Sequence, residues 1–144
     1  MKLNWWMGIC MVLCGCQTSL TNTPSRVIQC CDIPVHRTSA IAWSHEGEGY
    51  LFGGRDEEGQ IHHDLWKYNP LQDTWTDLGN TPLVSRVNGC ACCVGDKVYM
   101  GLGFRNAVYQ DSSYLRDWWE YTPAKNTWRR LNDFPNKNTV GAIV

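Results

Sequence analysis

The chain repeats a pattern of about fifty residues, and this repeat restricts the possible folds more than any other feature. Arg37 and Arg86 stand 49 positions apart, whereas the tryptophans at 75 and 128 stand 53 apart. The spacing therefore changes once, by four residues, which indicates one insertion in a loop of the second repeat, between Gly103 and Asp117. A period of this length is typical of proteins that stack one structural unit on the next.

Each repeat divides into four short segments that read as strands. The predicted strands cover residues 39–43, 49–54, 64–68 and 74–78 in the first repeat, and 89–94, 97–103, 117–121 and 127–131 in the second. The third segment alternates with period two, which places Trp66 and Tyr68 on one face and Leu65 and Lys67 on the other. Glycines end the second segment, where they let the backbone turn sharply and approach a neighbour closely.

The order of these features resembles the kelch repeat. An arginine stands near the start, a glycine pair (Gly53-Gly54) follows an aromatic strand, and Tyr-x-Pro and Thr-Trp come next, twice in register between residues 34 and 131. The resemblance implies that each repeat is one four-stranded antiparallel blade of a β-propeller. We therefore predict an all-β fold, a partial propeller with two blades. The second repeat departs from the pattern at Leu102, which separates its two glycines.

The ends of the pattern extend the prediction beyond the two blades. In each blade the last tryptophan and the next proline are seven positions apart. The same spacing counted back from Pro34 reaches Val27, so Arg26 to Cys30 takes the place of an outer strand. This divides the chain into an N-terminal strand of a split blade, two kelch repeats and the start of a third: 26–33, 34–81, 82–134 and 135–144. Two blades cannot close a ring of four to eight, so we expect the chain to be the N-terminal fragment of a longer product.

The first residues read as a targeting segment. Lys2 precedes an apolar run over 5–13, which is shorter than the roughly 20 residues that span a bilayer and fits a signal peptide. Leu13-Cys14-Gly15-Cys16 is similar to the bacterial lipobox, which implies cleavage after Gly15 and a lipid anchor on Cys16. We thus expect a lipoprotein signal peptide over 1–15, a flexible tether over 16–25 and a place in the cell envelope. Gln17 after the cysteine favours the outer membrane as the location. The alternative to a lipoprotein signal is a plain secretory signal peptide.

Composition excludes several kinds of partner. The net charge is -1, from 13 basic and 14 acidic residues, and a chain without a basic excess is not expected to bind nucleic acid. Five cysteines lie beyond the signal peptide and Cys16, at 30, 31, 90, 92 and 93, and their spacing does not match a zinc site. They fit small core residues better. His62-His63 fits a solvated loop better than a metal site, so no metal or cofactor is predicted.

Candidate ligand residues follow from the family resemblance. In kelch propellers one mouth of the ring binds ligands, through the loops between second and third strands and the segments that lead into first strands. Residues at those positions here are Arg37, Arg55, Arg86, Arg105, Asn106 and Tyr109. Arg37 and Arg86 either hold an anionic ligand or bond loop carbonyls or an acid of a neighbouring blade. The aromatic and amide side chains of the second loop suit a sugar and loop packing equally.

Sequence motifs leave the function open. The chain has no nucleophile elbow, phosphate loop or zinc helix, so no catalytic residue is assigned. We favour a binding module that holds a glycan or a protein partner. The resemblance also implies an alternative, a sialic-acid mutarotase or epimerase with acid–base chemistry at the ring mouth and no activity in this piece alone. A purely structural role is the third possibility, because one fold hosts many functions.

Overall fold

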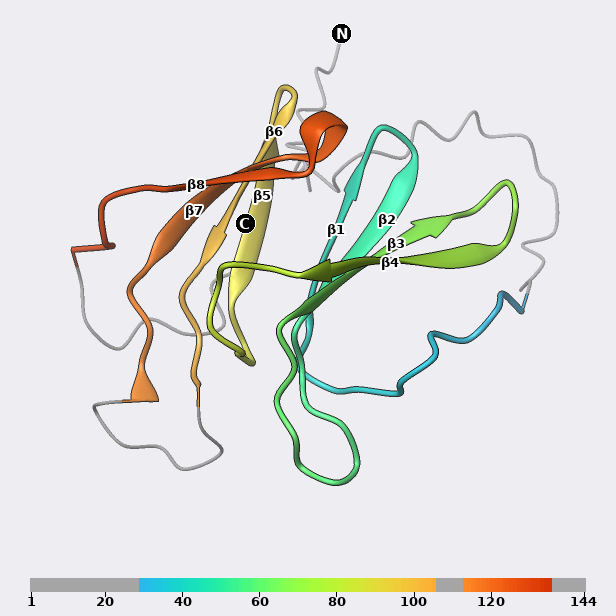
Figure 1. Ribbon diagram of the computed structural model, residues 1–144, viewed down its shortest axis with the longest axis horizontal. Coiled ribbons are helices and arrows are strands. Elements are labelled where there is room, and N and C mark those ends of the chain that lie inside the picture. The colour runs from blue at the N-terminus through green and yellow to red at the C-terminus, as the bar shows by residue number, and fades with distance from the viewer. Residues whose placement is uncertain (1–28, 106–112, 136–144) are drawn as a thin grey trace, which may run out of the picture.

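The computed structural model describes residues 29–105 and 113–135, and it confirms the predicted all-β partial propeller. Two four-stranded antiparallel sheets stand side by side (Figure 1). A short 3-10 helix, η2 (Pro123–Lys125), joins the last two strands of the second sheet. Within the described ranges, no helix is long and apolar enough to cross a membrane.

Each sheet is a meander of strands in sequence order. Blade 1 consists of β1 (Ile41–His45), β2 (Glu48–Phe52), β3 (Asp64–Asn69) and β4 (Thr74–Asn80), and blade 2 of β5 (Cys90–Val94), β6 (Lys97–Gly101), β7 (Trp118–Thr122) and β8 (Thr127–Arg130). The predicted and observed strands overlap in all eight cases. A two-residue turn closes β1 onto β2, and both of its residues, Glu46 (φ 50°) and Gly47 (φ 81°), have the positive φ that suits a tight hairpin.

The core lies between the two blades rather than inside either one. It contains Ile41, Tyr50, Phe52 and Leu65 from blade 1, Val98, Met100 and Tyr121 from blade 2, and Leu83 from the segment that links them. β3 shows the predicted alternation, because Leu65 is buried in this core while Trp66 is only half-buried. Burying each large apolar side chain contributes about 1.5–3 kcal/mol, so the blades stabilise one another.

The glycine pair of blade 1 accommodates the backbone of blade 2. Gly54 N donates to the carbonyl oxygen of Arg86 at 2.9 Å. A Cβ on Gly53 would lie 2.7 Å from the same oxygen, closer than real contacts allow. The second repeat keeps this backbone shape without the glycine pair, since Leu102 (φ 61°) matches Gly53 (φ 68°) and Gly103 (φ 89°) matches Gly54 (φ 91°). For a leucine, this left-handed conformation costs about 1–2 kcal/mol.

The described part of the N-terminal segment lies against the outer end of blade 1. Residues 29–33 contain no strand. Cys31 N donates to Asp73 Oδ1 at 2.8 Å, and Trp75 Nε1 donates to the Cys31 carbonyl at 3.2 Å. Pairing of Arg26 to Cys30 with a late strand stays a prediction. The signal peptide, Cys16, the tether, residues 26–28 and residues 136–144 lie outside the described residues.

Candidate functional site

Arg37 and Arg86 have buried side chains and occupy equivalent places in the two blades. Each lies in the segment that leads into the first strand of its blade, where this segment meets the β2–β3 or the β6–β7 loop; we call this end of the sheets the rim. Arg86 donates through Nη1 and Nη2 to the two carboxylate oxygens of Asp117, at 2.9 and 2.6 Å. It also donates to the carbonyl oxygens of Leu102 and Val84, both at 3.1 Å. The Arg86 side chain is 0% exposed. Its donors therefore face the protein and not a ligand.

Arg37 repeats this arrangement in blade 1. Its guanidinium donates to Asp64 at 2.7 and 3.1 Å, to the Gly53 carbonyl at 3.1 Å and to the Val35 carbonyl at 3.2 Å. The side chain is 1% exposed. Both arginines bond loop carbonyls, as the structural alternative expected, but the acid that each one binds belongs to its own blade and not to a neighbouring one. A ligand at either guanidinium would have to displace this buried ion pair.

Each ion pair extends to a tryptophan. Trp119 Nε1 donates to Asp117 Oδ2 at 2.7 Å, and Trp66 Nε1 donates to Asp64 Oδ2 at 2.6 Å. Burial raises the pKa of Asp117, but the hydrogen bonds and charge of Arg86 and the Trp119 bond outweigh it and hold that pKa below its usual range. We call these groups the Arg–Asp–Trp triads. Their acids were not among the residues predicted from the sequence, although both recur in register, two positions before the tryptophan.

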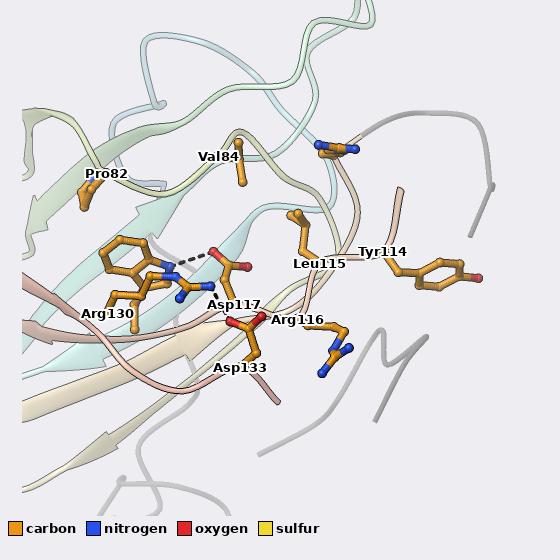
Figure 2. Close-up of a pocket in the computed structure, with 10 residues that line it drawn as sticks. Pro82, Val84, Tyr114, Leu115, Arg116, Asp117, Arg130 and Asp133 are labelled. Carbon is orange, nitrogen blue, oxygen red and sulfur yellow. Dashed lines mark hydrogen bonds and ion pairs between the residues drawn. The ribbon is translucent and has the colours of Figure 1, made fainter. Parts of the chain in front are cut away.

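A cavity of about 460 Å³ opens at the rim of blade 2 (Figure 2). Its wall comes from the link between the blades, the β6–β7 loop and the end of β8, and consists of Pro82, Val84, Arg105, Tyr114, Leu115, Arg116, Asp117, Trp119, Arg130 and Asp133. In the view of Figure 2, Asp117, Arg130, Asp133 and Arg116 are drawn near one another, with Tyr114 farther along the wall. The volume falls within the range of small-molecule sites.

The cavity wall has a positive charge excess. Both of its acids are already paired, Asp117 with Arg86 and Asp133 with Arg130. Arg116 Nε donates to the Phe134 carbonyl at 3.0 Å. Within the described part of the chain, neither Arg116 nor Arg105 forms an ion pair. These guanidinium groups are therefore suited to a polar or anionic ligand.

The remaining predicted residues are distributed among three places. Arg105 is exposed in the large cavity. Arg55 lines a separate cavity of about 200 Å³ on blade 1, beside Asp56, so the structure does not bring these two arginines together. Asn106 and Tyr109 lie outside the described residues.

The side chain of His62 is paired with an acid of its own loop. His62 Nε2 lies 2.8 Å from Asp56 Oδ2, and this pairing lowers the pKa of the carboxyl despite the opposing effect of desolvation. Across residues 29–105 and 113–135, no three His, Cys, Asp or Glu side chains gather as metal ligands.

Comparison with protein families places this geometry in a known context. Residues 45–82 match the family model for the kelch motif. The chain carries a kelch motif. Over 72 residues it is 40% identical to the human "Kelch domain-containing protein 3", an alignment that covers 47% of this chain and 19% of that protein.

A second group of similar proteins aligns with more of the chain. The "N-acetylneuraminate epimerase" of Pasteurella multocida is 25% identical over 142 residues, which cover 75% of this chain and 37% of that protein. A solved structure, "Structure of YjhT", superimposes with a TM-score of 0.60 at 19% identity and supports the kelch propeller fold, over 73% of this chain and 40% of that one. The chain thus spans less than half the length of each of these proteins.

Proposed function

We propose that this chain belongs to a kelch propeller that acts as a binding module for a glycan or a protein, with the blade 2 cavity as its ligand site. The observation that supports this role is the pair Arg105 and Arg116, which line the cavity and form no ion pair with a described residue. A guanidinium that is not held in a buried ion pair binds a ligand at lower cost than Arg86 would.

A glycan array and a membrane-protein array, both probed with labelled protein, test the proposal. Replacing Arg105 and Arg116 together by alanine is expected to weaken binding at least tenfold. Arg55→Ala is the matched control, because that arginine lines the other cavity, and it should leave binding within twofold. Failure of the wild-type protein to bind either array, or equal binding by the double variant, would contradict the proposal.

We also propose that Cys16 anchors the protein by lipid to the cell envelope, in the outer membrane, facing the periplasm or the cell surface. The support is the Leu13-Cys14-Gly15-Cys16 motif after a short apolar run, with Gln17 after the cysteine. Two or more acyl chains give stable membrane binding where one does not.

A second candidate function is that of an N-acetylneuraminate epimerase. The observation in its favour is the alignment with the bacterial epimerase, which covers 75% of this chain. Because the aligned part is 37% of that enzyme, we expect this chain to bind the sugar without turning it over. Two-dimensional NMR of labelled protein titrated with N-acetylneuraminate is the test. A shift of the Trp119 indole signal, with no change in the anomer ratio of the sugar, would agree with this candidate function. The absence of any shift at millimolar sugar would exclude it.

A further inference from the structure

The geometry points to a more specific ligand for the blade 2 cavity, and this inference rests on the function proposed above. We infer that the cavity takes one sugar ring, which stacks by its apolar face on the Trp119 indole while its hydroxyl groups bond the Arg130–Asp133 pair. In this arrangement Arg86 is a positioning residue, because it does not line the cavity and holds Asp117, which in turn holds the indole.

The Trp119 ring is fixed from two sides. Its Nε1 is bonded to Asp117, which Arg86 holds in turn. Trp119 also packs against the core cluster and lines the cavity, so part of its surface is buried and part borders the cavity. A fixed, half-buried ring loses little freedom when a ligand arrives. The C–H groups on one face of a sugar ring suit the negative face of such an aromatic system.

The polar partner stands beside the ring. Trp119 and Arg130 are paired across β7 and β8, so both side chains lie on the same face of the sheet. Arg130 forms an ion pair with Asp133, and the two side chains are 54% and 43% exposed. Figure 2 shows this pair close to Asp117. A sugar hydroxyl both donates and accepts, so a guanidinium and a carboxylate together match it better than a positive charge alone.

The site faces the interior of the two-blade unit. Trp119 shares its face of β7 with Tyr121, which belongs to the core between the blades. Blade 1 packs on this face, so a further blade stacked on the opposite face of blade 2 would leave the indole in place.

Blade 1 supplies a natural comparison. It has the same triad, with Trp66 in place of Trp119. The residue paired with Trp66 across the sheet is Asp77, whereas Trp119 is paired with Arg130. The tryptophan anchor is thus repeated in both blades, while the charged partner beside it is not.

Equilibrium binding to a panel of neutral and acidic methyl pyranosides, measured by NMR titration, tests the inference. Trp119→Ala is expected to weaken binding at least tenfold, and Asp133→Asn several-fold. Trp66→Ala is the matched control, since it breaks the same indole–carboxylate bond in blade 1 and should leave affinity within twofold. Urea unfolding of both tryptophan variants establishes that they are folded to the same extent.

The outcomes separate this inference from the function on which it rests. Equal affinity in Trp119→Ala and wild type, or equal losses in the Trp119 and Trp66 variants, would overturn the stacking site. A third outcome is that the chain binds a protein from the array, loses this binding when Arg105 and Arg116 are replaced, and binds no pyranoside. That outcome would overturn the sugar as the ligand but would still support the binding module. Binding to nothing in either experiment would overturn both.

Discussion

Replacing Arg86 by methionine should destabilise the protein more than any other single change at the rim. The substitution keeps much of the side-chain volume but removes four hydrogen bonds, two of them to the Asp117 carboxylate. Asp117 would remain with a side chain only 14% exposed and its counter-charge gone. A carboxylate in that position either stays charged without a partner or takes up a proton, and both are unfavourable.

The expected loss follows from the burial of the pair. Breaking a buried ion pair by removing one partner costs about 3–5 kcal/mol of the free energy of unfolding. Arg37→Met should cost less, because its partner Asp64 is 20% exposed and water relieves part of the penalty. The double variant Arg86→Met with Asp117→Leu should lose less than the two single losses added together, with an interaction energy of about 2–3 kcal/mol.

Urea unfolding, followed by tryptophan fluorescence and by circular dichroism, measures these differences. Equal m-values across the variants would show that the comparison concerns stability and not the compactness of the unfolded chain. A loss below about 1 kcal/mol for Arg86→Met, or additive effects in the double variant, would refute the reasoning that the pair acts as a buried unit.

Two further predictions concern other parts of the chain. The hydrogen bond from Arg129, with Lys97 nearby, lowers the pKa of Glu120 from 4.5 to about 2. Because the folded-state pKa is the lower one, this group stabilises the protein above about pH 4.5 and loses that effect as the pH falls toward about 2. Glu120→Gln should therefore flatten the dependence of the urea midpoint on pH in that window, and an unchanged slope would argue against it. In a Gram-negative host, Cys16→Ala should abolish labelling by a radioactive fatty acid and release the protein from membranes, whereas Cys14→Ala should not; labelling of both variants would disprove the anchor.

The strands were predictable because their signals are local and repeated. Alternation along β3 distinguished Leu65 from Trp66, and glycines marked the end of β2, so the sequence contained both the elements and their faces. The repeat in register strengthened each assignment, since a pattern that occurs by chance in one segment seldom recurs at a fixed offset.

The rim was less predictable because its contacts join residues that spacing does not connect. Arg86 and Asp117 stand 31 residues apart, and only the path of the β6–β7 loop brings them together. The sequence singled out the arginine and left its partner open. Had Asp64 and Asp117 been recognised as a recurring pair, the sequence would have named the acid that each arginine binds.

Leu102 shows a different limit of sequence reasoning. A glycine pair predicts a left-handed turn, and its interruption by Leu102 weakened that prediction for the second repeat. The backbone adopts it anyway, because Leu102 is 2% exposed and the favourable burial of its side chain offsets the local strain.

The bond between Gly54 and the Arg86 carbonyl means that the unit of duplication and the unit of stability are not the same stretch of chain. A sequence repeat ends before residue 82, yet its glycine pair is completed by the backbone of the repeat that follows. A repeat that was gained or deleted whole would therefore need a following repeat that brings an equivalent carbonyl to these glycines. A recombination point between the glycine pair and the following arginine could join glycines to a segment whose carbonyl does not reach them. This contact therefore limits where two kelch repeats can be joined.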